Sequence, residues 1–223
     1  MSRLVLISDT HTMHRQLVVP EADILVHAGD VTYTGKRSQY EDFADWFNKQ
    51  PHRHKCCVAG NHDFNAEEVL RPLLDESVYF LKDQGIELCG IKFWGSPYTP
   101  TFGMWANMAD RGEEIRKHWD LIPNDTDVLI THGPPYGILD SSELTNGSVG
   151  CEELEMAVSR VQPSIHVFGH IHGGAGHKSG AENSMYTDFY NASMVNEDYR
   201  PVNKPWVVDI QVKTKENTNV DSK

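Results

Sequence analysis

Short, nearly continuous runs of apolar residues recur along the chain, separated by stretches in which polar and apolar positions are mixed. The clearest runs cover residues 3–8, 23–28, 55–59, 127–131 and 164–168. Strands that are covered on both faces carry such unbroken runs, whereas half-exposed strands alternate apolar and polar residues. The pattern therefore predicts five buried strands of an α/β protein.

Amphipathic stretches between these runs predict helices. The stretches cover residues 38–50, 65–74, 107–119 and 150–161. In the first, Phe43, Trp46 and Phe47 form one apolar stripe at helical spacing. The second begins with Asn65 and carries Glu68 three positions later, which predicts an N-cap with a capping box.

Further short strands are expected in three other segments. These are residues 78–98, 186–193 and 205–212, and the first of them suggests a second sheet, antiparallel or mixed. Residues 213–223 are polar and lack periodicity, so we expect a disordered tail. The chain has no internal repeat and no low-complexity linker, which predicts one domain over residues 1–212.

The overall charge limits the classes of partner. The chain has 223 residues and a formal net charge of -12 at pH 7. That charge disfavours a surface that binds a nucleic acid polymer or an anionic lipid through basic residues. A small phosphate ester stays compatible with it, because bound cations can reverse the local field.

The cysteines and the N-terminus both indicate a cytoplasmic protein without a membrane segment. The four cysteines include the adjacent pair Cys56 and Cys57 and form no C-x-x-C motif, so we expect reduced thiols. The first apolar run covers only residues 4–7 before Ser8, which is too short for a signal peptide or a membrane span.

Side chains that bind metals follow the ends of the five predicted strands. They are Asp9 and His11 after the first, Asp30 after the second, Asn61, His62 and Asp63 after the third, His132 after the fourth, and His170 and His172 after the fifth. Loops at the carboxyl ends of strands in open α/β sheets gather on one edge, where ligands bind. We therefore expect these residues to converge on one site.

With His62 and Asp63 set aside, this donor set favours two divalent cations over one. Two aspartates, one asparagine and four histidines exceed the four ligands of a tetrahedral zinc, and no cysteine is among them. Mixed carboxylate, amide and imidazole donors suit Mn, Fe or Zn. Two such ions, about 3.5–4 Å apart, can clamp a phosphoryl group. Asp30, at the end of a central strand, is the expected bridging carboxylate.

His170 and His172 are separated by a single residue at the end of the fifth predicted strand. On an extended segment, residues i and i+2 project to the same side. We therefore expect one of these histidines to serve each cation.

In this order and at these intervals, the strand-end residues resemble the signature of the calcineurin-like metallophosphoesterases. Longer segments are similar to one branch, the metallophosphoesterase-domain-containing (MPPED-like) phosphodiesterases. They include HAGDVTYTG at 27–35, DVLITHGPPYGILD at 127–140 and HVFGHIHGGAG at 166–176. The similarity extends to about residue 210, which is nearly the whole chain.

The resemblance implies a four-layer α/β/β/α sandwich of two mixed sheets flanked by helices, and phosphodiesterase activity, often on cyclic nucleotides. It also implies two ligand sets, which are Asp9, His11, Asp30 and His172 for one cation, and Asp30, Asn61, His132 and His170 for the other. Some vertebrate members of this branch carry glycine in place of His170, which is expected to weaken the second metal site. We expect Mn²⁺, with Fe or Zn as alternatives.

The predicted reaction is hydrolysis of a small phosphodiester by a hydroxide held between the two cations. The resemblance places His62 facing the substrate, where it would protonate the leaving group as a general acid. Two interpretations of Asp63 fit the sequence: it orients His62, or it helps to start the next helix.

Two interpretations also fit the aromatic residues of segment 96–105. Tyr98, Phe102 and Trp105 either line a base-binding pocket or pack in the core or a loop.

The remaining histidines are expected to be structural or exposed. They are His14, His27, His52, His54, His118, His166 and His177. His14 and His177 are the first candidates for an exception, because each lies a few residues from a predicted ligand.

Two other functions stay open. A phosphomonoesterase could use the same site, although the arginine-bearing DRG of the protein Ser/Thr phosphatases is replaced here by GDVTYTGKR at 29–37. A non-catalytic binding scaffold is the third possibility, but such relatives lose ligands, and this chain keeps a suitable residue at every position. The sequence defines neither the natural ester nor the oligomeric state.

Overall fold

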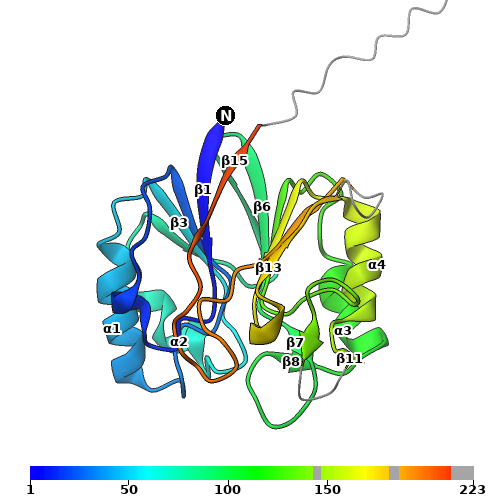
Figure 1. Cartoon of the computed structure of the whole chain (residues 1–223), viewed down its shortest axis with the longest axis horizontal. Helices are drawn as coiled ribbons and strands as arrows, with labels where there is room; N and C mark the ends of the chain where they lie inside the picture. Colours follow the sequence, from blue (N-terminus) through cyan, green and yellow to red (C-terminus); the bar gives the residue numbers. More distant parts are fainter. Residues whose placement is uncertain (143–146, 181–185, 212–223) are drawn as a thin grey trace, which may run out of the picture.

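The computed structural model describes residues 1–142, 147–180 and 186–211, and it contains two mixed sheets that lie face to face (Figure 1). The first sheet has the strand order β15-β1-β2-β3-β4. Its strands are β1 (Ser2–Ile7), β2 (Ile24–His27), β3 (His54–Cys57), β4 (Val78–Phe80) and β15 (Trp206–Ile210). The first four strands are parallel, and β15 runs antiparallel to β1, with Ile210 opposite Ser2.

The second sheet has the order β13-β14-β12-β9-β6-β5. Its strands are β5 (Gln84–Leu88), β6 (Ile91–Ser96), β9 (Val128–Thr131), β12 (Ile165–Phe168), β13 (Gly176–Lys178) and β14 (Asp188–Asn191). The four inner strands are parallel and both edge strands are antiparallel to their neighbours.

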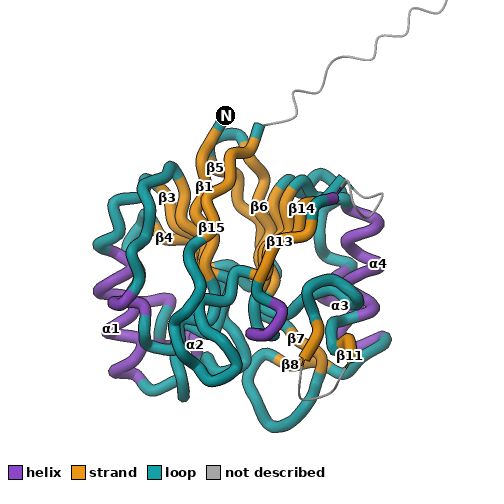
Figure 2. Tube along the Cα trace, in the orientation of Figure 1, coloured by secondary structure: helices purple, strands orange, loops and turns teal. Residues whose placement is uncertain are grey.

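Helices cover the outer face of each sheet (Figure 2). They are α1 (Arg37–Asn48) and α2 (Ala66–Val69) on the first sheet, and α3 (Glu113–Trp119) and α4 (Glu152–Val161) on the second. The short elements are the 3-10 turns His14–Gln16, Arg71–Leu73 and His172–Gly174, and the strands β7 (Thr99–Pro100), β8 (Met108–Ala109), β10 (Ser141–Ser142) and β11 (Gly147–Ser148). The predicted four-layer α/β/β/α sandwich is therefore confirmed.

The unbroken apolar runs are explained by burial of each strand on both faces. In β1, Leu4 and Leu6 point into the core between the two sheets, whereas Val5 and Ile7 point into the core under α1. Strand β9 of the second sheet is also buried on both faces, and its Leu129 packs under α3 and α4. Because the core between the sheets draws residues from both, we propose that residues 1–212 fold as one domain.

The five predicted strands are divided between the two sheets, three in the first and two in the second. The other expected strands also form, and β15 completes the first sheet by pairing with β1. The predicted tail at 213–223 lies outside the described residues. No helix in the part of the chain that the structure describes has the length and apolarity needed to cross a bilayer.

The helix predicted over residues 65–74 begins after the predicted N-cap residue Asn65, but its predicted extent and capping hydrogen bonds are wrong. The α-helix ends at Val69 and is followed by a 3-10 turn that contains Pro72. Proline has no N–H for the hydrogen bond that would continue the helix. Asn65 adopts a left-handed conformation and its side chain makes no capping hydrogen bond, so the capping box does not form.

The helix predicted over residues 107–119 begins six residues later, at Glu113. Met108 and Ala109 instead pair with β7 as strand β8. Gly112, with φ 86°, turns the chain between the two elements, and this conformation favours glycine.

Candidate metal centre

The carboxyl ends of β1, β2 and β3 in the first sheet face those of β9 and β12 in the second, and the predicted ligands lie in the loops between them. Three groups of donor atoms result, each with all its atoms within 4.8 Å of one another. The groups are Asp9, His11 and His172; His11, Asp30 and His62; and Asp30, His132 and His170. Residues from five separate loops therefore meet in one site, as the sequence predicts.

In the first group, the imidazoles of His11 and His172 face each other and the Asp9 carboxylate. Their Nε2 atoms are 3.3 Å apart, and His172 Nε2 lies 3.6 Å from Asp9 Oδ1. The Asp9 carboxylate also accepts the backbone N–H of His170 at 3.1 Å, which ties a loop of the first sheet to a loop of the second.

Asp30 joins the two halves of the site. Its Oδ2 lies 3.7 Å from His11 Nε2 and 3.3 Å from His132 Nε2. Its Oδ1 accepts the backbone N–H of His62 at 2.8 Å. On the far side, His132 Nε2 lies 2.9 Å from Asn61 Oδ1. One carboxylate thus faces imidazoles from both sheets, which is the geometry a bridging ligand needs.

Backbone carbonyls fix the orientation of three imidazoles. The Nδ1 atoms pair with carbonyl oxygens, in His11 with Thr32 at 3.1 Å and in His132 with Ala28 at 2.9 Å. In His62, Nδ1 pairs with the carbonyl of Tyr33 at 2.8 Å. Such outer partners set the tautomer that leaves Nε2 free to bind a metal or exchange a proton.

The backbone is strained where it delivers these side chains. Asp9, His11, Asp30 and His170 all have positive φ, at 52°, 40°, 55° and 66°. Residues other than glycine rarely adopt this conformation, and it clusters at functional sites. His170 therefore does not lie on an extended segment, so the expectation that His170 and His172 project to the same side of a strand is wrong. The left-handed turn at His170 separates the two imidazoles, and each joins a different donor group.

Close backbone approach requires glycine beside the ligands. A Cβ atom on Gly169 would collide with the Asp9 carboxylate and the Ser8 hydroxyl, and one on Gly60 would collide with the Asp30 carboxylate.

Asp63 does not contact the His62 ring nitrogens, so the first interpretation of Asp63 is wrong. Its carboxylate accepts the backbone N–H groups of Val31 (3.1 Å), Thr32 (2.9 Å) and Gly60 (2.9 Å), and the Thr32 hydroxyl at 2.7 Å. Asp63 instead clamps the loop after β2 to the loop after β3. The sequence could not identify three of these four partners, because they are backbone groups.

Burial and neighbouring charge act against each other in the site. Burial would raise the pKa of Asp9, but His172 and His132 together outweigh it and the pKa falls to about 2. The pKa of Asp30 is also lowered, since His132 and His11 outweigh its burial. Burial lowers the pKa of His11 to about 4. Burial would also lower the pKa of His132, but Asp30, Asp9 and the Ala28 carbonyl together raise it to about 9. Two buried carboxylates thus stay ionised at neutral pH, beside an imidazole that keeps a proton.

This donor set fits divalent cations. It combines buried carboxylates, an amide oxygen and imidazole nitrogens held at short distances, which is a mixture that Mn, Fe and Zn accept. The additional proton gives the His132 imidazole a positive charge within the donor group. A divalent cation that binds to this imidazole would displace that proton.

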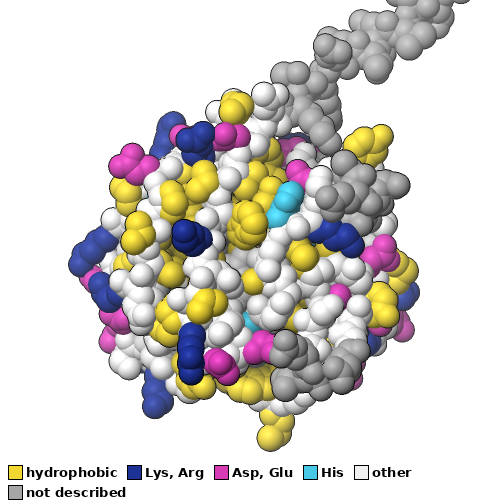
Figure 3. Space-filling view, in the orientation of Figure 1, with side chains coloured by type: hydrophobic (Ala, Val, Ile, Leu, Met, Phe, Trp, Pro, Cys, Tyr) yellow, Lys and Arg dark blue, Asp and Glu magenta, His cyan; other side chains and the backbone are white. Residues whose placement is uncertain are grey.

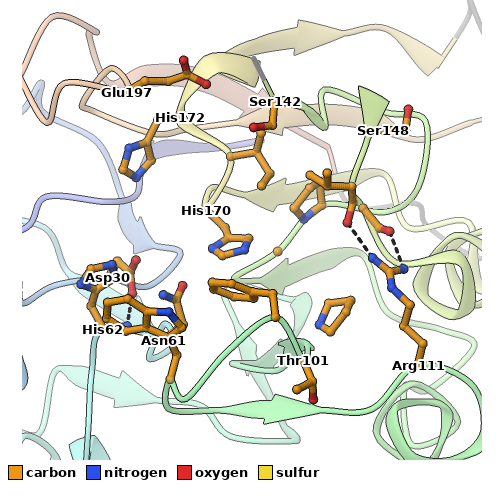
Figure 4. Close-up of a pocket in the computed structure, with 18 of the residues that line it drawn as sticks. Asp30, Asn61, His62, Thr101, Arg111, Ser142, Ser148, His170, His172 and Glu197 are labelled. Carbon is orange, nitrogen blue, oxygen red and sulfur yellow. Dashed lines mark hydrogen bonds between the residues drawn. The ribbon is translucent and has the colours of Figure 1, made fainter. Parts of the chain in front are cut away.

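A cavity of about 510 Å³ opens from these residues (Figure 4). Arg111 lines the side of the cavity opposite Asp30 and His62 (Figure 4). It is the single lysine or arginine among the described lining residues. Its guanidinium donates to the carbonyls of Gly150 and Val149, both at 2.8 Å, and pairs with Glu152.

Two of the three aromatic residues from segment 96–105 line the cavity. The Trp105 ring lies 4.4 Å from the His62 ring, and the Phe102 ring lies 5.2 Å from the His170 ring. Tyr98 instead stacks on His118 at 3.5 Å.

Glu197 and Tyr199 also line the cavity, and the sequence analysis missed them. They lie in an irregular segment that follows β14 and have no motif of their own. The two histidines named as exceptions lie elsewhere: His14 packs against Trp46, and His177 stacks on Tyr190.

The chain is similar in sequence to a known family and to individual proteins of other organisms. Residues 2–174 match the family described as calcineurin-like phosphoesterase. Metallophosphoesterase domain-containing protein 1 of Homo sapiens is 35% identical over 235 residues, which cover 94% of this chain and 71% of the human protein. UPF0046 protein K07C11.7 of Caenorhabditis elegans is 36% identical over 228 residues, which cover 95% of this chain and 76% of the worm protein.

Solved structures show the same fold at low sequence identity. One crystal structure superimposes with a TM-score of 0.62 at 14% identity, covering 85% of this chain and 90% of that chain. The crystal structure of TT1561 of Thermus thermophilus gives a TM-score of 0.56, also at 14% identity, covering 85% of this chain and 88% of that chain.

Proposed function

The chain belongs to the calcineurin-like phosphoesterase family, in its metallophosphoesterase-domain-containing branch, and we propose that it is a phosphodiesterase that uses two divalent cations. Family membership itself indicates a metal-dependent phosphoester hydrolase. The observation that carries the finer proposal is the position of Asp30, whose Oδ2 faces both His11 and His132.

The proposed ligands form two sets that share Asp30. The first is Asp9, His11, Asp30 and His172, and the second is Asp30, Asn61, His132 and His170. When bound, two cations neutralise charge on a phosphoryl group and lower the pKa of a water molecule. We propose Mn²⁺, with Fe or Zn as alternatives, because the donors mix carboxylate, amide and imidazole.

His62 is the proposed general acid. Its Nδ1–H donates to the Tyr33 carbonyl, and in the doubly protonated imidazolium Nε2 also carries a proton, which it can donate toward the cavity. From there it can protonate the leaving alkoxide of an ester held beside Asp30. Asp63 acts one step further away, by fixing the backbone around Thr32 and Gly60.

The lining of the cavity favours a diester over a monoester. A phosphate monoester carries an extra negative charge, and a site for it gains from a free guanidinium. Arg111 already pairs with Glu152 and two carbonyls, so it adds little positive charge to the cavity. The aromatic rings of Phe102 and Trp105 give room and contact for a second ester substituent.

A small phosphodiester such as a cyclic nucleotide is the proposed substrate class. On the face in Figure 3, basic side chains are scattered among acidic and apolar ones, which fits a small substrate better than a nucleic acid polymer. A cytoplasmic location is also proposed, and the four cysteines are free.

The proposal is tested by comparing two chromogenic esters on protein reconstituted with Mn²⁺. We expect hydrolysis of bis(p-nitrophenyl) phosphate to exceed that of p-nitrophenyl phosphate, and both to stop after chelation. A preference for the monoester would favour a phosphomonoesterase. Absence of activity on both esters together with absence of bound metal would favour a binding scaffold.

A further inference from the structure

The segment after β14 returns to the metal centre from outside the family-matched residues 2–174. Ser193 forms a parallel bridge with Ser8, and Met194 donates its N–H to the Ser8 carbonyl at 2.9 Å. Ser8 directly precedes Asp9. The segment is therefore held beside the first ligand of the site.

A tight turn at the tip of this segment presents Tyr199. The Asn196 side chain accepts the backbone N–H groups of Asp198 at 3.2 Å and Arg200 at 2.9 Å. Tyr199 itself has φ 57°, which is unusual for a bulky residue. The hydrogen bonds of the turn stabilise this backbone conformation.

The Tyr199 ring forms one wall of the cavity. It meets the His11 ring edge-on at 4.9 Å and the His172 ring edge-on at 5.1 Å. These two imidazoles belong to the group that contains Asp9. The Tyr33 ring lies 5.3 Å from the Tyr199 ring. A phosphoryl group bound next to this half of the site would lie beside the phenol.

The Tyr199 hydroxyl has no hydrogen-bond partner among the residues that the structure describes. Its ring is only partly buried and lines the cavity. The guanidinium of Arg111, by contrast, already donates to the carbonyls of Gly150 and Val149. An uncharged donor is therefore available at the wall of a cavity whose lining arginine is already paired.

We propose that Tyr199 contacts the substrate by donating a hydrogen bond from its hydroxyl to a non-bridging oxygen of the phosphoryl group. This inference rests on the phosphoesterase function proposed above and deepens it. The competing role is packing alone, in which the ring supports His11 and His172 and the hydroxyl contributes nothing.

Tyr199→Phe separates the two roles, because it removes the hydroxyl and keeps the ring. Tyr79→Phe is the matched control, since Tyr79 lies on β4 beside His54 and outside the cavity lining. Three quantities are measured for each variant: bound Mn²⁺ per chain, kcat/KM for bis(p-nitrophenyl) phosphate, and the Kd of inorganic phosphate by calorimetry on Mn²⁺-loaded protein.

We expect Tyr199→Phe to keep its metal, to bind phosphate about 10-fold more weakly or worse, and to lose about 10- to 100-fold in kcat/KM, as for a hydrogen bond to a charged group. Tyr79→Phe should match the wild type. The inference is overturned if Tyr199→Phe stays within about twofold in both phosphate affinity and kcat/KM, or if its losses follow a loss of metal.

Failure of the proposed function gives a different result. Wild-type protein that binds Mn²⁺ and phosphate but cleaves neither ester contradicts the phosphodiesterase proposal, while the phosphate affinity of Tyr199→Phe still decides the role of the hydroxyl. Wild-type protein that binds no phosphate overturns the inference as well.

Discussion

Histidines inside the sheets differ from histidines at the carboxyl edge, although both are buried. His27 on β2 and His166 on β12 are fully buried, and His11 and His132, just beyond β1 and β9, are 2% and 0% exposed. The edge histidines each point Nε2 at the Asp30 carboxylate. Burial alone therefore does not distinguish a candidate metal ligand from a core residue.

The strand histidines have neutral partners instead. His27 pairs with the Thr10 hydroxyl at 3.0 Å and His166 with the Thr131 hydroxyl at 2.8 Å. Burial lowers the pKa of both to about 3, so they are neutral near pH 7. Among these four histidines, the two candidate ligands are distinguished by the buried Asp30 carboxylate that their Nε2 atoms face.

The largest expected effect concerns His62, which reaches the cavity at the carboxyl edge. His62→Gln should keep its bound metal and lose about 10²–10⁴-fold in kcat on diesters with poor leaving groups, because the proposed general acid is removed. Steady-state kinetics and metal analysis check this. A variant that loses metal yet cleaves normally would reverse the assignment.

A second prediction sets the edge directly against the interior. His170→Gly should lose one cation per chain and on the order of 10²-fold in kcat/KM, as when one electrostatic contact to the transition state is removed. His166→Gln, only four residues earlier, should keep both cations and its activity. Equal metal content in the two variants would remove the distinction between edge and interior.

The pH dependence of metal binding is a third and smaller effect. Attraction to Asp30 raises the pKa of His132, so in metal-free protein this imidazole holds a proton that a cation must displace. The apparent Kd for Mn²⁺ should therefore rise as pH falls from 8 to 6, by up to about tenfold per pH unit for one proton. Calorimetry at several pH values measures it, and a flat profile would contradict it.

The smallest effect is on stability. The pKa of His166 is about 3 in the folded protein and rises to its ordinary value of 6.5 on unfolding. The unfolded chain then binds more protons below pH 6.5, so stability falls as pH drops toward 3, by up to about 1.4 kcal/mol per pH unit for each such histidine. Urea denaturation at pH 7 and 5.5 should give a shallower dependence for His166→Gln than for the wild type. Parallel curves would show that His166 titrates normally.

Most of the fold was predictable because the apolar runs report burial on both faces. The predicted helix boundaries were wrong where the backbone conformation of a single residue overrides the pattern of apolar and polar positions. Pro72 cut a predicted helix short, and Gly112 separated a strand from a helix in a segment predicted as one helix. Sequence alone also did not divide the strands between two sheets, because pairing partners lie far apart along the chain.

The candidate ligands were predictable because polar residues directly after buried strands must lie at a sheet edge. The hydrogen-bond partners that orient the imidazoles were not predictable. For His11, His132 and His62 these partners are backbone carbonyls, which every residue has. Tyr199 was missed for a related reason. It reaches the site through the pairing of Ser193 with Ser8, which no local pattern predicts.

In the proposed site, the Asp30 carboxylate serves both halves. The most direct test is the metal content per chain, by mass spectrometry, of wild type and Asp30→Asn after loading with Mn²⁺ and desalting. We expect two ions in the wild type and at most one in Asp30→Asn. Two ions retained by Asp30→Asn would contradict this expectation.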